Sequence, residues 1–436
     1  MEFKRLGISS DGRRIVDASG APFFYLADTA WELFHSLDRE EAARYLDDRA
    51  AKGFTAIQAV ALAEFDGLNR PNAYGRTPLC RDEQGRFDPR HPDTSGEYSY
   101  WAHVDSIVRA ACERGLYIAM LPTWGDKFNR LWGMGPEVFD PESAYEYGLW
   151  LGRRYADAPN IIWVLGGDRP LDNARHFAVV RAMAHGLREG DGGAHIMTFH
   201  PTGACSSSKP LHEEDWLDFN MIQSGHTRRR FNYEMIERDW NMQPPKPVLD
   251  GEPGYEDHPE DFDAANGYLD AADARQFAYM ALFSGACGHT YGDHSIWSMV
   301  RAIPVEGFAP AHFCKTWDKA LDSPGAGQMH HARDLLMSHD FLHFMPAPER
   351  VTLRLPGVMH IPVLESGTCL MAYTAQGRAV PLEAGVLGGG RARVHWFDPR
   401  TGGYTEAGET DCAIENSYAP PSGGRGCDWV LVLEKL

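Results

Sequence analysis

Apolar residues in this 436-residue chain gather in short runs that alternate with longer amphipathic stretches. The amphipathic stretches repeat their apolar positions at helical spacing. One of them, residues 38–53, carries helix-end signals at Asp38, Glu41 and Gly53. The short runs have the length of strands buried on both faces. Eight such runs are found, at residues 23–31, 54–62, 116–126, 160–168, 194–201, 216–226, 246–253 and 287–297.

Eight strand–helix alternations predict an α/β fold, a (β/α)8 or TIM barrel, over residues 1–345. A doubly wound open sheet is the alternative. It is disfavoured because no GxGxxG turn follows the first strand, and because eight repeats are more than such a sheet usually needs.

The pattern changes after about residue 345. Short alternating runs, separated by glycine-rich turns, occupy residues 350–380, 392–408 and 427–436. Alternation of this kind is typical of half-buried antiparallel strands. We therefore predict a small antiparallel β-sandwich domain over residues 346–436, with Pro346 and Pro348 in the linker.

Charge narrows the range of partners. Lysine and arginine total 42 against 61 acidic residues, which gives a net charge of −19. Such a surface repels nucleic acid and anionic membranes, because binding them depends on basic side chains. No apolar run approaches the ~18 residues of a membrane span. We expect no nucleic acid or membrane partner, and a polyanionic substrate is disfavoured overall.

Cysteine usage and the N-terminal segment point to a cellular location. The eight cysteines contain no CxxC pair, which favours free thiols in a reducing compartment. The first residues lack the apolar core of a signal peptide. The expected localisation is cytoplasmic, although a leader trimmed from the chain would leave the same sequence.

Two acids stand at predicted strand ends, where barrels of this kind place their catalytic residues. Asp168 ends the fourth strand after two glycines, and Glu252 ends the seventh between a glycine and a proline. A single strand-end acid is more often a helix cap or an ion-pair partner. Two of them match the carboxyl pair of glycosidases, in which one protonates the leaving oxygen. The other attacks the anomeric carbon or activates a water, depending on their separation.

Ten further residues at or near strand ends are candidate sugar-binding residues: Asp28, Trp31, Gln58, Trp124, His200, Gln223, His226, Tyr291, Asp293 and Trp297. Several of them have a structural alternative. Asp28 precedes a turn that it could cap, and His200 could form a core hydrogen bond. Trp124 and Trp297 could stack on sugars or pack in the core.

Metal catalysis is the competing chemistry at these strand ends. The eighth run supplies His289, Asp293 and His294. However, the first strand carries no HxH pair, and no HExxH motif occurs. We therefore expect no metal and no other cofactor.

Several blocks of the chain resemble the apiosidase-like glycoside hydrolases, glycoside hydrolase family 140, in the order found in that family. Residues 12–60 resemble its N-terminal part. The remaining blocks are "IIWVLGGDRP", "TFHPTG", "DFNMIQSGH", "PVLDGEPGYE" and "SGACGHTYGDHSIW". The resemblance covers roughly residues 5–345, and the remainder resembles the collagen-binding-type β-sandwich that commonly follows.

The resemblance implies a retaining mechanism without a cofactor, with Asp168 as acid/base and Glu252 as nucleophile. In the wider superfamily the acid/base is usually a glutamate preceded by asparagine. Here Gly167 precedes Asp168, as expected for the apiosidase-like branch. The shorter aspartate requires the leaving group to sit closer. The activity described for the family is removal of the branched pentose apiose from pectic side chains.

We therefore expect a retaining exo-glycosidase that removes a terminal pentose, with β-apiosidase activity first. A small imported plant glycoside or oligosaccharide fits the chain as well as pectin does, because the net charge is −19. Two alternatives stay open: a glycosidase for another sugar such as arabinofuranose, and a carbohydrate-binding barrel that has lost catalysis. The sequence does not give the anomeric specificity, the oligomeric state or the role of the C-terminal domain.

Overall fold

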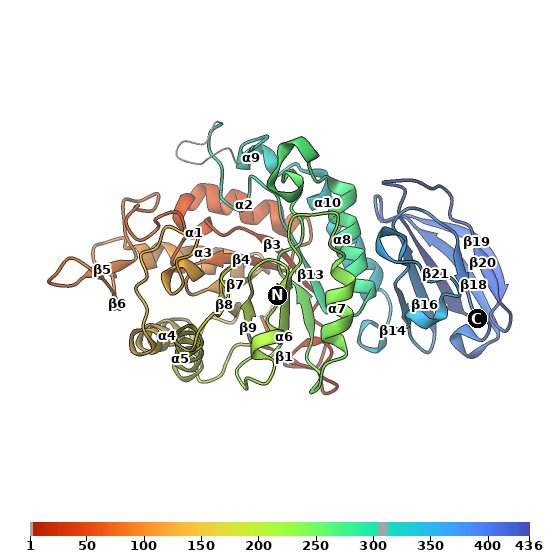
Figure 1. Ribbon diagram of the computed structural model, residues 1–436, viewed down its shortest axis with the longest axis horizontal. Helices are drawn as coiled ribbons and strands as arrows, with labels where there is room; N and C mark the ends of the chain where they lie inside the picture. The colour runs from red at the N-terminus through yellow and green to blue at the C-terminus, as the bar shows by residue number, and fades with distance from the viewer. Residues whose placement is uncertain (1–2, 304–311) are drawn as a thin grey trace.

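The computed structural model describes residues 3–303 and 312–436. Its larger part is a barrel of parallel strands, each lying within a run that predicts a strand (Figure 1). The strands are β3 (Tyr25–Thr29), β4 (Ala56–Val60), β7 (Tyr117–Leu121), β8 (Ile161–Gly166), β9 (Met197–His200), β11 (Asn220–Gln223), β12 (Val248–Asp250) and β13 (Gly288–Tyr291). The predicted (β/α)8 barrel is confirmed.

Helices surround this barrel and connect successive strands. The long ones are α2 (Arg39–Ala51), α3 (Tyr100–Glu113), α4 (Pro141–Tyr155), α5 (Ala174–Gly190), α7 (Asn232–Trp240), α8 (Ala271–Phe283) and α10 (Pro324–Met337). Short helices are α1 (Leu33–Ser36), α6 (Ser208–Leu211) and α9 (Trp317–Ala320). The connection from β9 to β11 contains only α6 and the short strand β10 (Cys205–Ser206).

The start of α2 shows how local sequence sets an element boundary. The Asp38 carboxylate accepts hydrogen bonds from the backbone N–H groups of Glu40 and Glu41, both at 2.9 Å. The Glu41 side chain accepts in return from the Asp38 N–H at 3.0 Å. Three otherwise unpaired backbone donors at the helix start are thereby satisfied. After the Lys52 cap, Gly53 turns the chain at a φ of +79°, which favours glycine.

The barrel is nearly closed. Its strands are paired in the order β11, β12, β13, β3, β4, β7, β8 and β9. Three hydrogen bonds bridge the remaining gap between β9 and β11. The Asp218 N–H donates to the Met197 carbonyl and the Met197 N–H donates to the Asp218 carboxylate, both at 2.8 Å, while the Thr198 hydroxyl donates to the Phe219 carbonyl at 2.6 Å.

Alternate residues of the barrel strands separate into two apolar layers, as the period of two requires. In β3, Tyr25 and Ala27 point into the barrel, whereas Leu26 packs in the layer beneath the helices. The N-terminal hairpin of β1 (Leu6–Ile8) and β2 (Ile15–Asp17) packs Leu6 and Ile8 against the interior cluster. A second hairpin, β5 (Leu79–Arg81) and β6 (Phe87–Pro92), projects between β4 and α3.

The C-terminal part is an antiparallel β-domain, as predicted. Six strands form one sheet in the order β14 (Met345–Pro346), β15 (Val363–Glu365), β16 (Cys369–Thr374), β21 (Trp429–Lys435), β18 (Arg391–Phe397) and β19 (Tyr404–Asp411). A two-stranded ribbon, β17 (Val380–Leu382) and β20 (Asn416–Tyr418), covers one face. Val380 and Leu382 pack there against Leu370 and Leu431.

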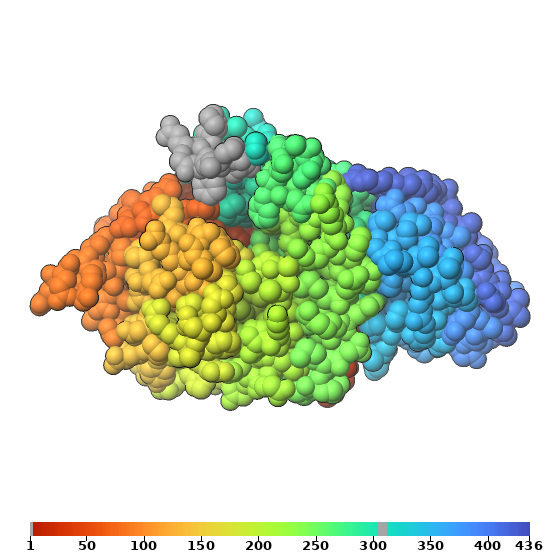
Figure 2. Space-filling view, viewed as in Figure 1, coloured from red at the N-terminus to blue at the C-terminus, as the bar shows by residue number. Residues whose placement is uncertain are grey.

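The other face of this sheet packs on the barrel. Tyr373 of β16 stacks on Tyr279 of α8, with ring centroids 5.0 Å apart. Arg275 of α8 donates to Asp428 at 2.8 Å, and both side chains are buried. In the space-filling view the blue C-terminal domain borders the green part of the barrel directly (Figure 2). The two parts therefore share a continuous apolar and ionic interface.

Two general features concern the whole described chain. The eight cysteines are free thiols in the structure. Across residues 3–303 and 312–436, no helix is both long enough and apolar enough to cross a membrane.

Candidate active site

Asp168 stands on a turn that glycine makes sterically accessible. Gly166 and Gly167, at the end of β8, have φ values of +93° and +102°, and Asp168 follows at +56°. A Cβ atom on Gly166 would lie 2.3 Å from the His200 carbonyl oxygen, and one on Gly167 would lie 2.7 Å from the Gly125 nitrogen. The Gly–Gly–Asp sequence therefore allows a close turn that carries the Asp168 carboxyl to the pocket, at the cost of a strained aspartate backbone.

The Asp168 carboxyl has two donors on the same oxygen. Arg169 Nη1 lies 3.1 Å and Trp132 Nε1 3.4 Å from Asp168 Oδ2. Burial raises the pKa of Asp168, and the nearby negative charge of Glu252 raises it further. The charges of His200 and Arg169 act in the opposite direction without reversing the shift. Asp168 therefore holds its proton to a higher pH than an ordinary aspartate.

Glu252 is reached from β12 through Gly251. The backbone on both sides is fixed, because Gln58 Nε2 donates to the Gly251 carbonyl at 2.9 Å and the Gly225 N–H donates to the Glu252 carbonyl at 3.0 Å. A Cβ on Gly251 would lie 2.4 Å from Met221 Sδ, so this position has room only for glycine. The backbone that carries Glu252 is therefore held in place at the barrel mouth.

Two histidines contact the Glu252 carboxylate. His200 Nε2 lies 3.0 Å from Oε2, and His226 Nε2 lies 3.3 Å from Oε1. The Tyr255 N–H donates to His226 Nδ1 at 3.3 Å, so the proton of a neutral His226 is placed on Nε2, facing Glu252. Burial alone would raise the pKa of Glu252, but the two histidine contacts outweigh it and hold the pKa at about 2. Glu252 is therefore an anion in the range where Asp168 keeps its proton.

Both acids line one pocket of about 860 Å³. Five of the predicted sugar-binding residues line it as well: Trp31, Trp124, Gln223, His226 and Trp297. Trp31 and Trp124 are buried and pack at 5.3 Å between ring centroids, so they form the floor. The Trp124 indole nitrogen and the Gln223 carbonyl oxygen are buried without a hydrogen-bond partner in the described chain.

Five other predicted residues lie behind the pocket lining. His200 contacts Glu252 and packs edge-on against Trp31, with ring centroids 5.3 Å apart. Gln58 also accepts from Tyr25 Oη at 3.2 Å. Neither side chain is among the described residues that line the pocket. Both support Glu252 from beneath, one through its carboxylate and the other through the preceding carbonyl.

Asp28, Tyr291 and Asp293 are also outside the lining formed by the described residues. The Asp28 carboxylate accepts from Tyr45 Oη and Arg49 Nε, both at 2.6 Å, in a completely buried ion pair. Tyr291 Oη donates to Glu256 at 2.6 Å. Asp293 accepts from Ser323 Oγ at 2.6 Å and from the Ser295 N–H at 2.8 Å. These polar groups connect barrel elements to one another.

The pocket also contains residues that the sequence interpretation did not select. Glu64 and Tyr255 follow β4 and Glu252 closely enough for their chain positions to have suggested them. Burial, and then the charges of Glu32, Asp126 and Asp168, raise the pKa of Glu64 well above its usual value. Trp132 and Phe262 belong to loops distant from any strand end and gave no such signal.

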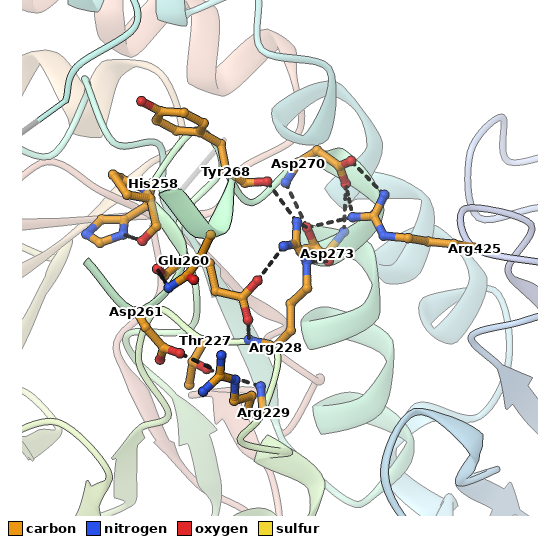
Figure 3. A network of polar contacts seen from close by, with 12 residues as sticks. Thr227, Arg228, Arg229, His258, Glu260, Asp261, Tyr268, Asp270, Asp273 and Arg425 are labelled. Atoms are coloured by element: carbon orange, nitrogen blue, oxygen red, sulfur yellow. Dashed lines mark hydrogen bonds and ion pairs between the residues drawn. The ribbon is translucent and has the colours of Figure 1, made fainter. Parts of the chain in front are cut away.

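A network of charged residues joins Arg228, which follows the pocket-lining Thr227, to Arg425 of the C-terminal domain (Figure 3). Arg228 binds both oxygens of Asp273, at 2.9 and 2.8 Å, and also pairs with Glu260. Arg425, from the C-terminal domain, donates to the same Asp273 at 2.8 Å and to Asp270. The wall residues Thr227, Pro259, Asp261 and Phe262 flank these contacts. The C-terminal domain is thus linked by ion pairs to the pocket wall.

No group of three or more His, Cys, Asp or Glu side chains suited to a metal ion occurs in residues 3–303 and 312–436.

Two protein-family models match parts of the chain. Residues 9–343 match the family model described as "Apiosidase-like, catalytic domain". Residues 358–434 match the model described as "Putative collagen-binding domain of a collagenase". No curated protein matches the chain.

Two solved structures are similar over almost the whole chain. One is a glycoside hydrolase family 5 protein from Bacteroides vulgatus ATCC 8482, with 30% identity and a TM-score of 0.90. That alignment covers 99% of this chain and 93% of the other. The second is described as a glycoside hydrolase, with 31% identity, a TM-score of 0.89, and coverage of 99% and 97%.

Proposed function

The chain belongs to the apiosidase-like family of glycoside hydrolases, and from this premise we propose that it removes a terminal pentose, apiose first, with retention of configuration. The proposal depends on one observation: the pKa values of two carboxyls in the same pocket are shifted in opposite directions. Asp168 has a raised pKa and Glu252 a lowered one. A proton donor beside a permanent anion is what glycoside cleavage requires.

In the first step, the protonated Asp168 carboxyl donates its proton to the oxygen that joins the sugar to its leaving group. A Glu252 carboxylate oxygen attacks the anomeric carbon as the bond to that oxygen breaks, and the leaving group departs as an alcohol. In the second step, the Asp168 carboxylate takes a proton from water. That water attacks the anomeric carbon, breaks the bond to Glu252 and releases the sugar.

The surroundings of Glu252 support its role as nucleophile. Its side chain is only 6% exposed, and one histidine lies close to each of its oxygens, His200 at 3.0 Å and His226 at 3.3 Å. The two histidines restrict the movement of the carboxylate. It is therefore less able to move back and leave room for the water molecule that an inverting mechanism needs. Direct attack, and hence retention, is the outcome that this rigid placement favours.

The pocket floor supports a hydroxyl-rich ligand. The Trp124 indole N–H is a donor and the Gln223 carbonyl an acceptor, and each is buried without a partner in the described residues. Buried polar groups without partners are costly, so a ligand that pairs with both is favoured. Sugar hydroxyls both donate and accept, whereas the adjacent Trp31 and Trp124 rings offer apolar surface to the ring carbons.

We propose family 140 because the sequence blocks quoted above occur in the order of that family, and Gly167 before Asp168 fits the apiosidase-like branch. A small uncharged or weakly charged glycoside is the proposed substrate, since the net charge of −19 opposes a polyanion.

Hydrolysis of synthetic aryl glycosides tests this proposal. The panel contains β-apioside, α-arabinofuranoside, β-xyloside and β-glucoside, each measured with the wild-type protein and with Glu252→Gln. We expect release from the apioside and a loss of roughly 10⁴-fold or more in the variant. If the wild-type protein hydrolysed the arabinofuranoside faster than the apioside, arabinofuranose would replace apiose as the proposed sugar. Binding without turnover on every sugar by the folded protein would contradict the enzymatic role.

A further inference from the structure

The loop between β7 and α4 exposes large apolar side chains at the pocket mouth. Trp132 is 63% exposed and Met134 is 56% exposed, and both line the pocket. Phe262, 74% exposed, lies on the wall that contains His226. Exposed apolar surface of this size beside a pocket is typical of a binding site, because covering it with a ligand removes it from water.

Trp132 is on the Asp168 side of the pocket. Its Nε1 lies 3.4 Å from Asp168 Oδ2. The Arg169 guanidinium lies over the indole ring, 4.5 Å from its centroid, and donates to the same Asp168 oxygen at 3.1 Å. Arg169 is buried and therefore supports the ring from the protein side. The rest of the indole surface faces solvent.

The reaction places the leaving group next to this indole ring. Asp168 protonates the oxygen between the sugar and the leaving group, so the first atoms of the leaving group must lie beside the Asp168 carboxyl. Trp132 is in contact with that carboxyl and has most of its surface free. Met134 lines both this pocket and an adjoining groove of about 680 Å³, which extends the same side of the site.

We propose that Trp132 and Met134 form the binding site for the leaving group, which is a ring with an apolar face. An aryl group and the carbon face of a second sugar share this chemistry. The proposal rests on the proposed role of Asp168 as acid. Trp132 and Met134 contribute apolar contact area, and Arg169 keeps the indole in place.

Kinetics with two leaving groups on the same sugar test the proposal. For 4-nitrophenyl β-apioside, Trp132→Ala should raise KM about tenfold, the range of an aromatic contact, whereas Trp132→Phe should stay within about threefold of wild type. Methyl β-apioside has no ring to bind, so its KM should rise much less in Trp132→Ala than the KM of the aryl glycoside does. Leu131→Ala is the matched control, because Leu131 is 51% exposed on the same loop but is not among the residues that line the pocket.

An equal loss on the two glycosides, or a larger loss on the methyl glycoside, would overturn the proposal, because Trp132 would then act on the sugar or through Asp168 and not on the ring of the leaving group. No loss on either would overturn it too. A disaccharide with apiose at its non-reducing end separates the two sources of the ring. A larger Trp132→Ala effect on the disaccharide assigns a sugar, and a larger effect on the aryl glycoside assigns an aromatic group.

A binding experiment with the free leaving group tests the ring site without requiring turnover. Its outcome is therefore independent of the proposed apiosidase activity. 4-Nitrophenol, followed by saturation-transfer NMR, should bind the wild-type protein and bind Trp132→Ala about tenfold more weakly. If no apioside is cleaved but this difference is found, the sugar assignment fails and the ring site stands. If 4-nitrophenol binds both proteins equally, the ring site fails.

Discussion

The Asp168 and Glu252 sides of the pocket hold their carboxyls in opposite ways. Asp168 is on a strained turn, and its partners include Trp132, an exposed loop residue. Glu252 is almost completely buried between two histidines, and hydrogen bonds fix the backbone on both of its sides. The contrast shows that a strand end supplies only a position. The partners decide whether an acid keeps or loses its proton.

After Glu252→Gln, the largest predicted effect comes from removing the proton donor. Asp168→Asn should lower kcat/KM by roughly 10²–10⁴-fold for a methyl glycoside, whose leaving group needs protonation. The loss should be much smaller for 4-nitrophenyl glycosides, because 4-nitrophenolate leaves without a proton. Activity of the wild-type protein should fall as the pH rises through the raised pKa of Asp168, and this limb should vanish in the variant. An equal loss on both leaving groups would contradict the acid role.

A third strand-end acid, Asp28, extends the comparison to a residue without access to the pocket. Asp28→Asn removes the completely buried partner of Arg49 and leaves it only the contact with Asp48, so the free energy of unfolding should fall by about 3 kcal/mol. Activity per folded molecule should be little changed. Denaturant unfolding monitored by circular dichroism measures this. Asp47→Asn, on the same helix, is the control, since its exposed pair with Arg114 should contribute about 1 kcal/mol or less. A large loss of kcat in the folded Asp28→Asn variant would show that Asp28 has a role in the active site after all.

Removing one of the histidine contacts to Glu252 should have a smaller effect on activity, but one that is specific to the pH profile. His226→Phe removes one contact that lowers the pKa of Glu252. Because attack needs the ionised carboxylate, the acidic limb of the kcat/KM profile should move to higher pH, with a loss of about tenfold. His226→Gln can still donate an N–H to Glu252 and should recover most of the activity. An unchanged acidic limb in His226→Phe would show that this histidine does not tune Glu252.

The smallest expected effect tests the link from the C-terminal domain to the pocket wall. Arg425→Ala removes ion pairs to Asp270 and Asp273, and Asp273 is the residue that also pairs with Arg228. Partly exposed pairs of this kind contribute up to about 1 kcal/mol, so KM should rise by at most about fivefold at unchanged kcat. Arg393→Ala, at an exposed arginine of the same domain, is the control. Equal KM values in the two variants would show that the domain does not position this wall.

The fold could be predicted because the sequence pattern states it directly. Strands buried on both faces require continuous apolar runs, and helices between them require helical spacing. The acids Asp168 and Glu252 were found for the same reason, since each follows its strand and a glycine. Both line the pocket.

The partners of each residue could not be predicted in this way. Asp28 is paired with Arg49 of α2, and Tyr291 is bonded to Glu256. Such pairings depend on how separate elements pack, which strand-end position does not reveal. Trp132 was missed because it lies in a loop. Neither the helical spacing of apolar residues nor the alternation typical of strands applies there.

The most direct test of the account is to trap the intermediate on Glu252. The wild-type protein would be incubated with a slow 2-deoxy-2-fluoro apioside carrying a good leaving group, digested and analysed by mass spectrometry. The account predicts one added glycosyl group, on the peptide that contains Glu252, and none on Asp168. A glycosyl group on another residue, or an unlabelled protein that releases product of inverted configuration, would contradict it.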